Sequence, residues 1–177
     1  VRVGLGAFEE LPRMFASAVG KPKRAMVVWS DATSERFGEA VEHALVDAGF
    51  AVSLLVLEVS PAGATLADAD TVFGALSANG ITCDDLVVAV GDAATCSVVC
   101  WCANQWCGRT ECALLPMTFD AMLTVATTMK PLVASSAHAL PAIAFRPEPG
   151  LVVCDLDLVR EADPEDLKLG YVVLVGT

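Results

Sequence analysis

The run Ala25-Met26-Val27-Val28-Trp29, followed by Ser30-Asp31, decides the fold class. An apolar run of this kind, with two adjacent valines, is typical of a buried strand. Directly after it, apolar residues recur at helical spacing from position 37 to position 48, with Thr33 placed to cap the helix and Gly49 to end it. A strand that leads straight into an amphipathic helix is the βα unit of α/β proteins.

The same alternation continues along the chain. It predicts further strands over 52–57, 86–90, 113–115 and 151–154, and further helices over 66–78, 93–106 and 117–128. Pro141, Pro147 and Pro149 predict an irregular segment over 131–149, because proline interrupts regular elements. We therefore predict a single Rossmann-like α/β domain over 1–177, with a mostly parallel sheet flanked by helices.

The composition narrows the classes of partner. Hydrophobic residues make up 55% of the 177 residues, and the formal net charge is −11. Nucleic-acid binding relies on clustered Lys and Arg, and anionic membranes repel an acidic chain, so we expect neither as a partner. No basic segment followed by an apolar core opens the chain, so we expect no export signal and a cytoplasmic location, where the seven cysteines remain free thiols.

The fold class also predicts where a ligand would bind. In open α/β sheets, ligands collect beyond the carboxyl ends of the strands, where helix N-termini attract anions. By that rule the candidate pocket is lined by Ser30-Asp31, Gly91-Asp92 and residues 116–118. The fold alone does not name the ligand.

The end of the chain carries the most specific motif. Leu151 to Leu158, continuing to Glu165 to Gly170, resembles the segment VVVDLDVLKTLPARELRAG of the 3-dehydroquinate synthase family. Residues 114–118 resemble its I-P-T-T segment, and Asp31 matches the acidic residue after its first Rossmann strand. The resemblance implies the N-terminal, NAD-binding domain of a shikimate-pathway lyase of aromatic amino acid biosynthesis. Iron-dependent alcohol and glycerol dehydrogenases share this domain.

The resemblance also implies site residues. It places cofactor contacts at Asp31, Gly91, Ser97 and Thr118, and substrate contacts at Arg109 and Lys130. Asp31 would lie near the adenine ribose, and Lys130 matches a lysine that the family uses for substrate anions.

The departures from the family fall on its functional motifs. The glycine turn G-G-G-x-x-G-D reads Gly91-Asp92-Ala93-Ala94-Thr95-Cys96-Ser97 here, so one glycine remains and Ser97 replaces the acidic residue. Asp92 places a carboxylate beside a pyrophosphate, and the Cβ atoms of Asp92 and Ala93 obstruct its approach to the backbone. We therefore expect a sharp fall in NAD affinity.

The substrate and metal motifs are also incomplete. The family's D-S-S-V-G-G-K aligns with residues 124–130, which keep Lys130 but lose the aspartate and both glycines. The family binds a divalent metal, usually zinc, through one Glu and two His; the Glu position falls on Val173, and the His residues belong to a helical C-terminal domain that residues 1–177 lack. We predict no metal site in this chain, and a β-type run from Tyr171 to Val175.

Other candidate groups have simpler structural interpretations. Five cysteines lie between positions 96 and 112, but without paired C-x-x-C spacing we interpret Cys96 and Cys100 as small buried residues on one helix face. His43 is predicted to be solvated, and His138 lies in the irregular segment without a visible partner. Glu148, Asp155 and the acidic cluster 163–166 are predicted to form solvated surface.

Together these patterns predict a degenerate 3-dehydroquinate synthase-like domain, inactive alone, with a binding, scaffolding or regulatory role. A homodimer, a missing C-terminal domain or a partner chain would cover the apolar run that starts at Tyr171. One alternative is an N-terminal fragment of a divergent active enzyme, which would convert 3-deoxy-arabino-heptulosonate 7-phosphate to 3-dehydroquinate with NAD and a metal. Another is a nucleotide or small-anion sensor.

Overall fold

A computed structural model describes residues 1–19, 23–60, 63–125, 127–135, 138–144, 146 and 148–175 of the protein. The sheet strands are β1 (Arg2–Gly4), β2 (Arg24–Trp29), β3 (Ala51–Val56), β4 (Leu86–Gly91), β5 (Glu111–Pro116) and β8 (Leu151–Asp155). The helices are α1 (Leu11–Val19), α2 (Asp31–Asp47), α3 (Leu66–Ala78), α4 (Ala93–Gln105), α5 (Phe119–Val125), α6 (Leu156–Glu161) and α7 (Pro164–Val175). Shorter elements are the 3-10 turns η1 (Ala7–Glu10) and η2 (Trp106–Gly108) and the hairpin strands β6 (Leu132–Ser135) and β7 (His138–Ile143).

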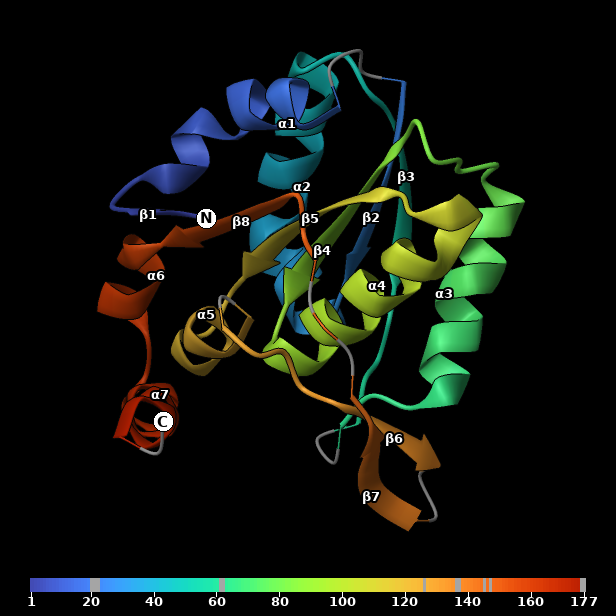
Figure 1. Ribbon diagram of the computed structural model, residues 1–177. Coiled ribbons are helices and arrows are strands. Elements are labelled where there is room, and N and C mark those ends of the chain that lie inside the picture. Colours follow the sequence, from blue (N-terminus) through green and yellow to red (C-terminus); the bar gives the residue numbers. More distant parts are fainter. Residues whose placement is uncertain are drawn as a thin grey trace.

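The six sheet strands are all parallel and follow the order β1-β8-β5-β4-β2-β3 (Figure 1). The chain passes from β2 outward to β3 and then returns to the other side of β2 to form β4. The connections therefore reverse direction between β2 and β4, which makes this the topological switch point. The predicted Rossmann-like fold class is confirmed.

Helices cover both faces of the sheet, and the strand sequences reflect this. In β2, Met26 and Val28 belong to the core beneath α3 and α4, whereas Ala25, Val27 and Trp29 belong to the core beneath α1 and α2. Since successive side chains of a strand point to opposite faces, an apolar residue at every position is what burial on both faces requires. Every residue of β4 is buried for the same reason.

The sequence predictions for β2 to β5, β8, α3 and α4 are confirmed, with bounds that differ by two residues or fewer. The predicted helix over 117–128 is shorter, as α5. The prediction that Thr33 caps a helix is wrong, because α2 already begins at Asp31. Ser30 remains extended, with φ −77° and ψ 155°, so the strand passes into the helix through a single residue.

The prediction of an irregular segment over 131–149 is also wrong in part. β6 and β7 pair as an antiparallel hairpin, with Pro141 opposite Val133 and register shifts on either side of Val133. A two-stranded ladder tolerates proline because the missing N–H can face away from its partner strand. Pro147 lies outside the described residues.

The predicted β-type run from Tyr171 to Val175 is helical instead, as the end of α7. Asp163 Oδ1 accepts hydrogen bonds from the N–H groups of Glu165 and Asp166 at 2.9 and 2.8 Å, and Pro164 occupies the first helical position. This start is favourable for a helix, and it outweighs the strand propensity of the residues that follow.

The acidic residues near this end are not all solvated, contrary to the sequence prediction. The Asp155 side chain is buried, and it accepts hydrogen bonds from Phe8 N and Asp157 N, both at 3.0 Å. It therefore caps α6 and fastens η1 to the end of β8. Among the described residues, no helix has the length and hydropathy that crossing a bilayer requires.

Candidate functional site

The switch point places the end of β4 and the start of α4 at one edge of the sheet. Gly91 ends β4 with φ 156°, and a Cβ atom at this position would lie 3.3 Å from the Cβ of Thr95. A side chain here would therefore press on the first turn of α4, which accounts for the glycine. Met117 N donates to Gly91 O at 2.9 Å, so the segment after β5 lies against the same turn.

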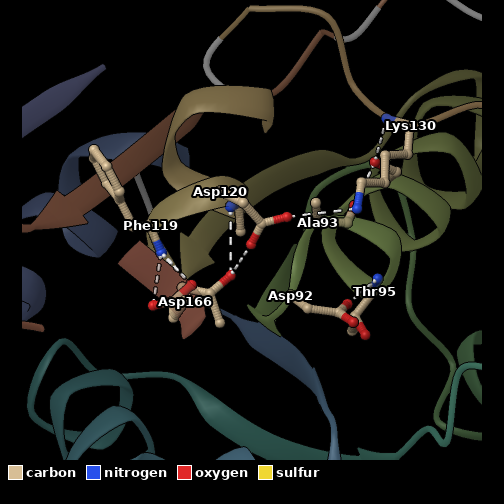
Figure 2. A network of polar contacts seen from close by, with 10 residues as sticks. Asp92, Ala93, Thr95, Phe119, Asp120, Lys130 and Asp166 are labelled. Atoms are coloured by element: carbon tan, nitrogen blue, oxygen red, sulfur yellow. Dashed lines mark hydrogen bonds and ion pairs between the residues drawn. The ribbon is translucent and has the colours of Figure 1, made fainter. Parts of the chain in front are cut away.

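The N-terminus of α4 carries its own carboxylate. Asp92 is the N-cap residue, and its Oδ1 accepts a hydrogen bond from Thr95 N at 2.8 Å. Figure 2 shows Asp92 and Thr95 side by side at this turn. Asp92 is exposed, whereas Ala93, Ala94 and Thr95 are buried. An anion is favourable here because the free N–H groups and the helix dipole are positive, and Asp92 supplies that anion from within the chain.

Two buried polar atoms flank the switch point. Among the described residues, Trp29 Nε1 at the end of β2 and Thr95 Oγ1 on α4 have no hydrogen-bond partner. The two residues are 5% and 1% exposed. A buried polar atom without a hydrogen bond is destabilising. Both of these atoms lie at this edge of the sheet.

Ser97 and Lys130 are joined through the backbone. Ser97 is fully buried; its Oγ donates to Ala93 O at 2.5 Å and accepts a hydrogen bond from Lys130 N at 2.8 Å. Met129, just before Lys130, has a left-handed φ of 59°, which turns the chain toward α4. Ser97 thus fastens the segment after α5 to the first two turns of α4.

The Lys130 side chain reaches Asp120 on α5. Lys130 Nζ lies 3.5 Å from Asp120 Oδ2, and Thr118 Oγ1 donates to Asp120 Oδ1 at 2.7 Å. Figure 2 shows Lys130 and Asp120 pointing toward each other above the start of α4. The Lys130 side chain is 49% exposed, so the pair contributes little to stability but places a cation at the crevice.

Asp166 brings α7 to the same region. Its two carboxylate oxygens each accept from Phe119 N at 3.2 Å, at the start of α5. Burial raises the pKa of the Asp166 carboxyl, the Phe119 N–H opposes the rise, and the Asp120 and Asp163 carboxylates add to it. Close by, Gly170 packs on Phe119: a Cβ there would meet the ring at 2.1 Å.

The raised pKa of Asp166 gives a pH-dependent prediction. A carboxyl whose pKa is higher in the folded protein stabilises the fold when protonated, and that contribution is lost as pH rises above its ordinary value of 3.8. Asp166→Asn keeps an oxygen for Phe119 N and removes the charge, so at neutral pH we expect a higher melting temperature than in the wild type. Thermal unfolding from about pH 3 to pH 7 should show the difference growing with pH. Asp166→Ala, which removes the acceptor, should melt lower at every pH; a constant offset for Asp166→Asn would contradict the assignment.

The structure brings together four of the six predicted site residues. Gly91, Ser97, Thr118 and Lys130 lie around the first two turns of α4. Asp31 is the first residue of α2 beside them, but its side chain lies outside the described part of the structure. Arg109 lies beyond the other end of α4, where it pairs with the exposed Glu148 at 2.7 Å.

Solved structures of known proteins have a similar fold. 2-Deoxy-scyllo-inosose synthase, in complex with carbaglucose-6-phosphate, NAD+ and Co2+, is similar with a TM-score of 0.82 and 20% identity, over 98% of this chain and 47% of that protein. The chain has the dehydroquinate-synthase-like fold. 2-Epi-5-epi-valiolone synthase from Streptomyces hygroscopicus subsp. jinggangensis 5008, with NAD+ and Zn2+ bound, follows with a TM-score of 0.77 and 17% identity, over 96% of this chain and 46% of that one.

The same fold extends to dehydrogenases. Glycerol dehydrogenase from Schizosaccharomyces pombe is similar with a TM-score of 0.71 and 18% identity, over 98% of this chain and 41% of that one. This chain thus spans about half the length, or less, of these solved structures. The sequence matches no protein-family model and no curated protein at a significant level.

The cysteines of the described chain are free thiols, as predicted, and most are buried. Burial raises the pKa of Cys102 to about 12 and also raises that of Cys96, so both are neutral thiols at physiological pH. No group of three or more His, Cys, Asp or Glu in the described residues is arranged to hold a metal ion. His43 is exposed, as predicted, and the His138 side chain lies outside the described residues.

The structural roles of Asp92, Asp120 and Asp166 were not predicted from the sequence. For Asp92 a signal existed, since an aspartate just before a helix, three residues ahead of Thr95, is a common N-cap arrangement. For the pairing of Asp120 with Lys130 and of Asp166 with Phe119 no local pattern exists, because these partners lie ten and 47 residues apart along the chain.

Proposed function

We propose that this chain is a catalytically degenerate dehydroquinate-synthase-like domain, which has a binding, scaffolding or regulatory role in place of catalysis. The observation that carries the proposal is the Asp92 carboxylate, which occupies the N-terminus of α4 and accepts the Thr95 N–H. In a Rossmann-like fold this is where backbone amides meet the phosphates of a dinucleotide.

The residues at the crevice do not fit NAD. A pyrophosphate at this turn would meet the Asp92 carboxylate. The residues that follow, Ala93 and Ala94, are buried alanines, so no second glycine lies close to Gly91. Like charges repel at short range, and the exposed carboxylate is screened only in part. We therefore derive no hydride transfer through this site.

The residues of this chain do not fit the divalent metal of the family either. Val173, at the position that the sequence resemblance assigns to a metal-binding Glu, lies partly buried in α7 and offers no ligand atom. Two neighbours carry Co2+ or Zn2+ together with NAD+. In this chain, the partly retained substrate region, with Lys130 held by Asp120 and Ser97, supports anchoring of an anion rather than its conversion.

A partner surface is part of the same proposal. α7 exposes large apolar side chains, each more than half accessible: Leu169, Tyr171, Val172, Leu174 and Val175. Large apolar side chains that gather on an exposed helix are typical of an interaction site. We propose that it is covered by a helical domain, by a partner chain or by a second copy of this chain, in a cytoplasmic setting.

Calorimetric titration of NAD into this chain and into Asp92→Gly tests the proposal. We expect no heat for the wild type up to millimolar NAD, because the carboxylate already satisfies the helix terminus. Removing it should tighten binding at least about tenfold, the equivalent of roughly 1.4 kcal/mol. Glycine at an N-cap costs only a few tenths of a kcal/mol, so the fold should persist.

Asp163→Gly is the matched control, since Asp163 caps α7 in the same way but lies at another helix. It should leave NAD binding unchanged. Micromolar binding by the wild type would overturn the proposal and favour the alternative of an active enzyme whose other half is supplied elsewhere. Complementation of a strain that lacks 3-dehydroquinate synthase would then be the next experiment.

A further inference from the structure

The cleft between β1 and α1 lies at the far edge of the sheet from β3, and β8 and β5 separate it from β4. It has a volume of about 370 Å³ and is lined by Arg2, Glu10, Arg13, Met14 and Ser17. A second hollow of about 180 Å³ shares Arg2, Glu10 and Met14 with it. The main hollow alone has the size of a small-ligand pocket.

Two guanidinium groups line this cleft. Neither Arg2 nor Arg13 forms a hydrogen bond or ion pair through its side chain with any other described residue. Four other basic residues do pair with a carboxylate: Lys23, Arg109, Lys130 and Arg160. In a chain with a net charge of −11, where acidic side chains outnumber basic ones two to one, 22 against 11, these two arginines lie in one cleft with no carboxylate partner among the described residues.

The chemistry of the lining selects the ligand class. Guanidinium presents a planar fork of donors that matches the two oxygens of a carboxylate or phosphate. Glu10 is the acidic side chain of the lining, so the charges sum to +1 in an otherwise acidic protein. Because the net charge of the protein is negative, other parts of its surface repel an oxyanion, and the cleft is favoured over them as a binding site.

We propose that the cleft between β1 and α1 binds a small ligand through an oxyanion group, phosphate or carboxylate, held by Arg2 and Arg13. Glu10 lowers the affinity and limits the charge that the cleft accepts. This cleft is separate from the switch point, so the proposal holds whether or not NAD binds there.

Isothermal titration of this chain with pyrophosphate and with citrate tests the proposal, because the two probes separate the phosphate and carboxylate sources. We expect saturable binding of at least one probe in the millimolar range or tighter. Arg2→Gln and Arg13→Gln should each weaken it about tenfold, since each removes a charge-assisted contact. Glu10→Gln should tighten it, because a repulsive charge is removed.

Arg160→Gln is the matched control, an exposed arginine outside the cleft that loses the same charge. It should leave the affinity unchanged. Absence of saturation by both probes at about 10 mM would overturn the proposal, as would equal weakening by Arg160→Gln and by the two cleft variants. The gain expected for Glu10→Gln guards against loss of folding, because an unfolded variant cannot bind more tightly.

Discussion

Asp155→Ala is expected to lower the free energy of unfolding by about 2–3 kcal/mol, because two partly buried N–H groups lose their acceptor. Asp155 is 5% exposed, and its two oxygens serve Phe8 N and Asp157 N. The first bond joins the start of the chain to its last sheet strand, and the second caps α6. Urea unfolding followed by circular dichroism measures the change.

Asp155→Asn is the graded control. Its single amide oxygen can serve one of the two N–H groups, while its NH2 group faces the other, so the loss should fall between zero and that of the alanine variant. A change within about 0.5 kcal/mol for Asp155→Ala would show that water or a shifted backbone replaces both bonds.

Ser97→Asp is expected to destabilise the protein by about 3 kcal/mol or more, because it buries a carboxylate at a fully buried position. The new oxygens would face Ala93 O, which now accepts from the serine hydroxyl at 2.5 Å. The substitution restores an acidic side chain where the resemblance places one, so it also measures how far the site has departed from the family. Urea unfolding again supplies the measurement.

Ser97→Ala separates packing from charge. It leaves Lys130 N without its acceptor at 2.8 Å and should cost about 1–2 kcal/mol. If Ser97→Asp proves as stable as the wild type, the position accommodates an acidic side chain, and the proposal of a catalytically degenerate site loses support.

The buried centre of the sheet was predictable from the sequence, and its margins were not. β2 and β4 are apolar at almost every position because helices cover both faces, and such runs are hard to mistake. β1 has three residues, too few to produce a recognisable pattern, and its place in the sheet depends on β8 at the other end of the chain. A pairing between segments so far apart cannot be predicted from the local sequence.

α7 shows how context overrides propensity. Tyr171 to Val175 contains three valines, which favour strands, yet Asp163 and Pro164 start a helix ahead of them. The face of α7 that packs inward contains Asp166, Gly170 and Val173, while its larger apolar residues face outward. A helix with this distribution cannot be recognised by amphipathic spacing.

The candidate site was predictable as a location and less so as chemistry. The rule for parallel sheets placed it at Gly91 and Thr118, and the structure brings Ser97 and Lys130 to the same place. The interpretation of Asp92 as a mere obstacle was incomplete, since its carboxylate also caps α4. The sequence did carry a signal for that role, because Asp92 stands directly before a predicted helix and three residues ahead of Thr95.

The pairing of β1 with β8 has a consequence for synthesis on the ribosome. Gly6 donates to Asp157, 151 residues further along, so the first strand has no sheet partner until nearly the whole described chain has been made. At about 10 residues per second, β1 waits roughly 15 s before β8 has been made. Val1, Val3 and Leu5 remain more than 60% exposed even in the finished fold, so pairing with β8 gives β1 backbone hydrogen bonds more than side-chain burial.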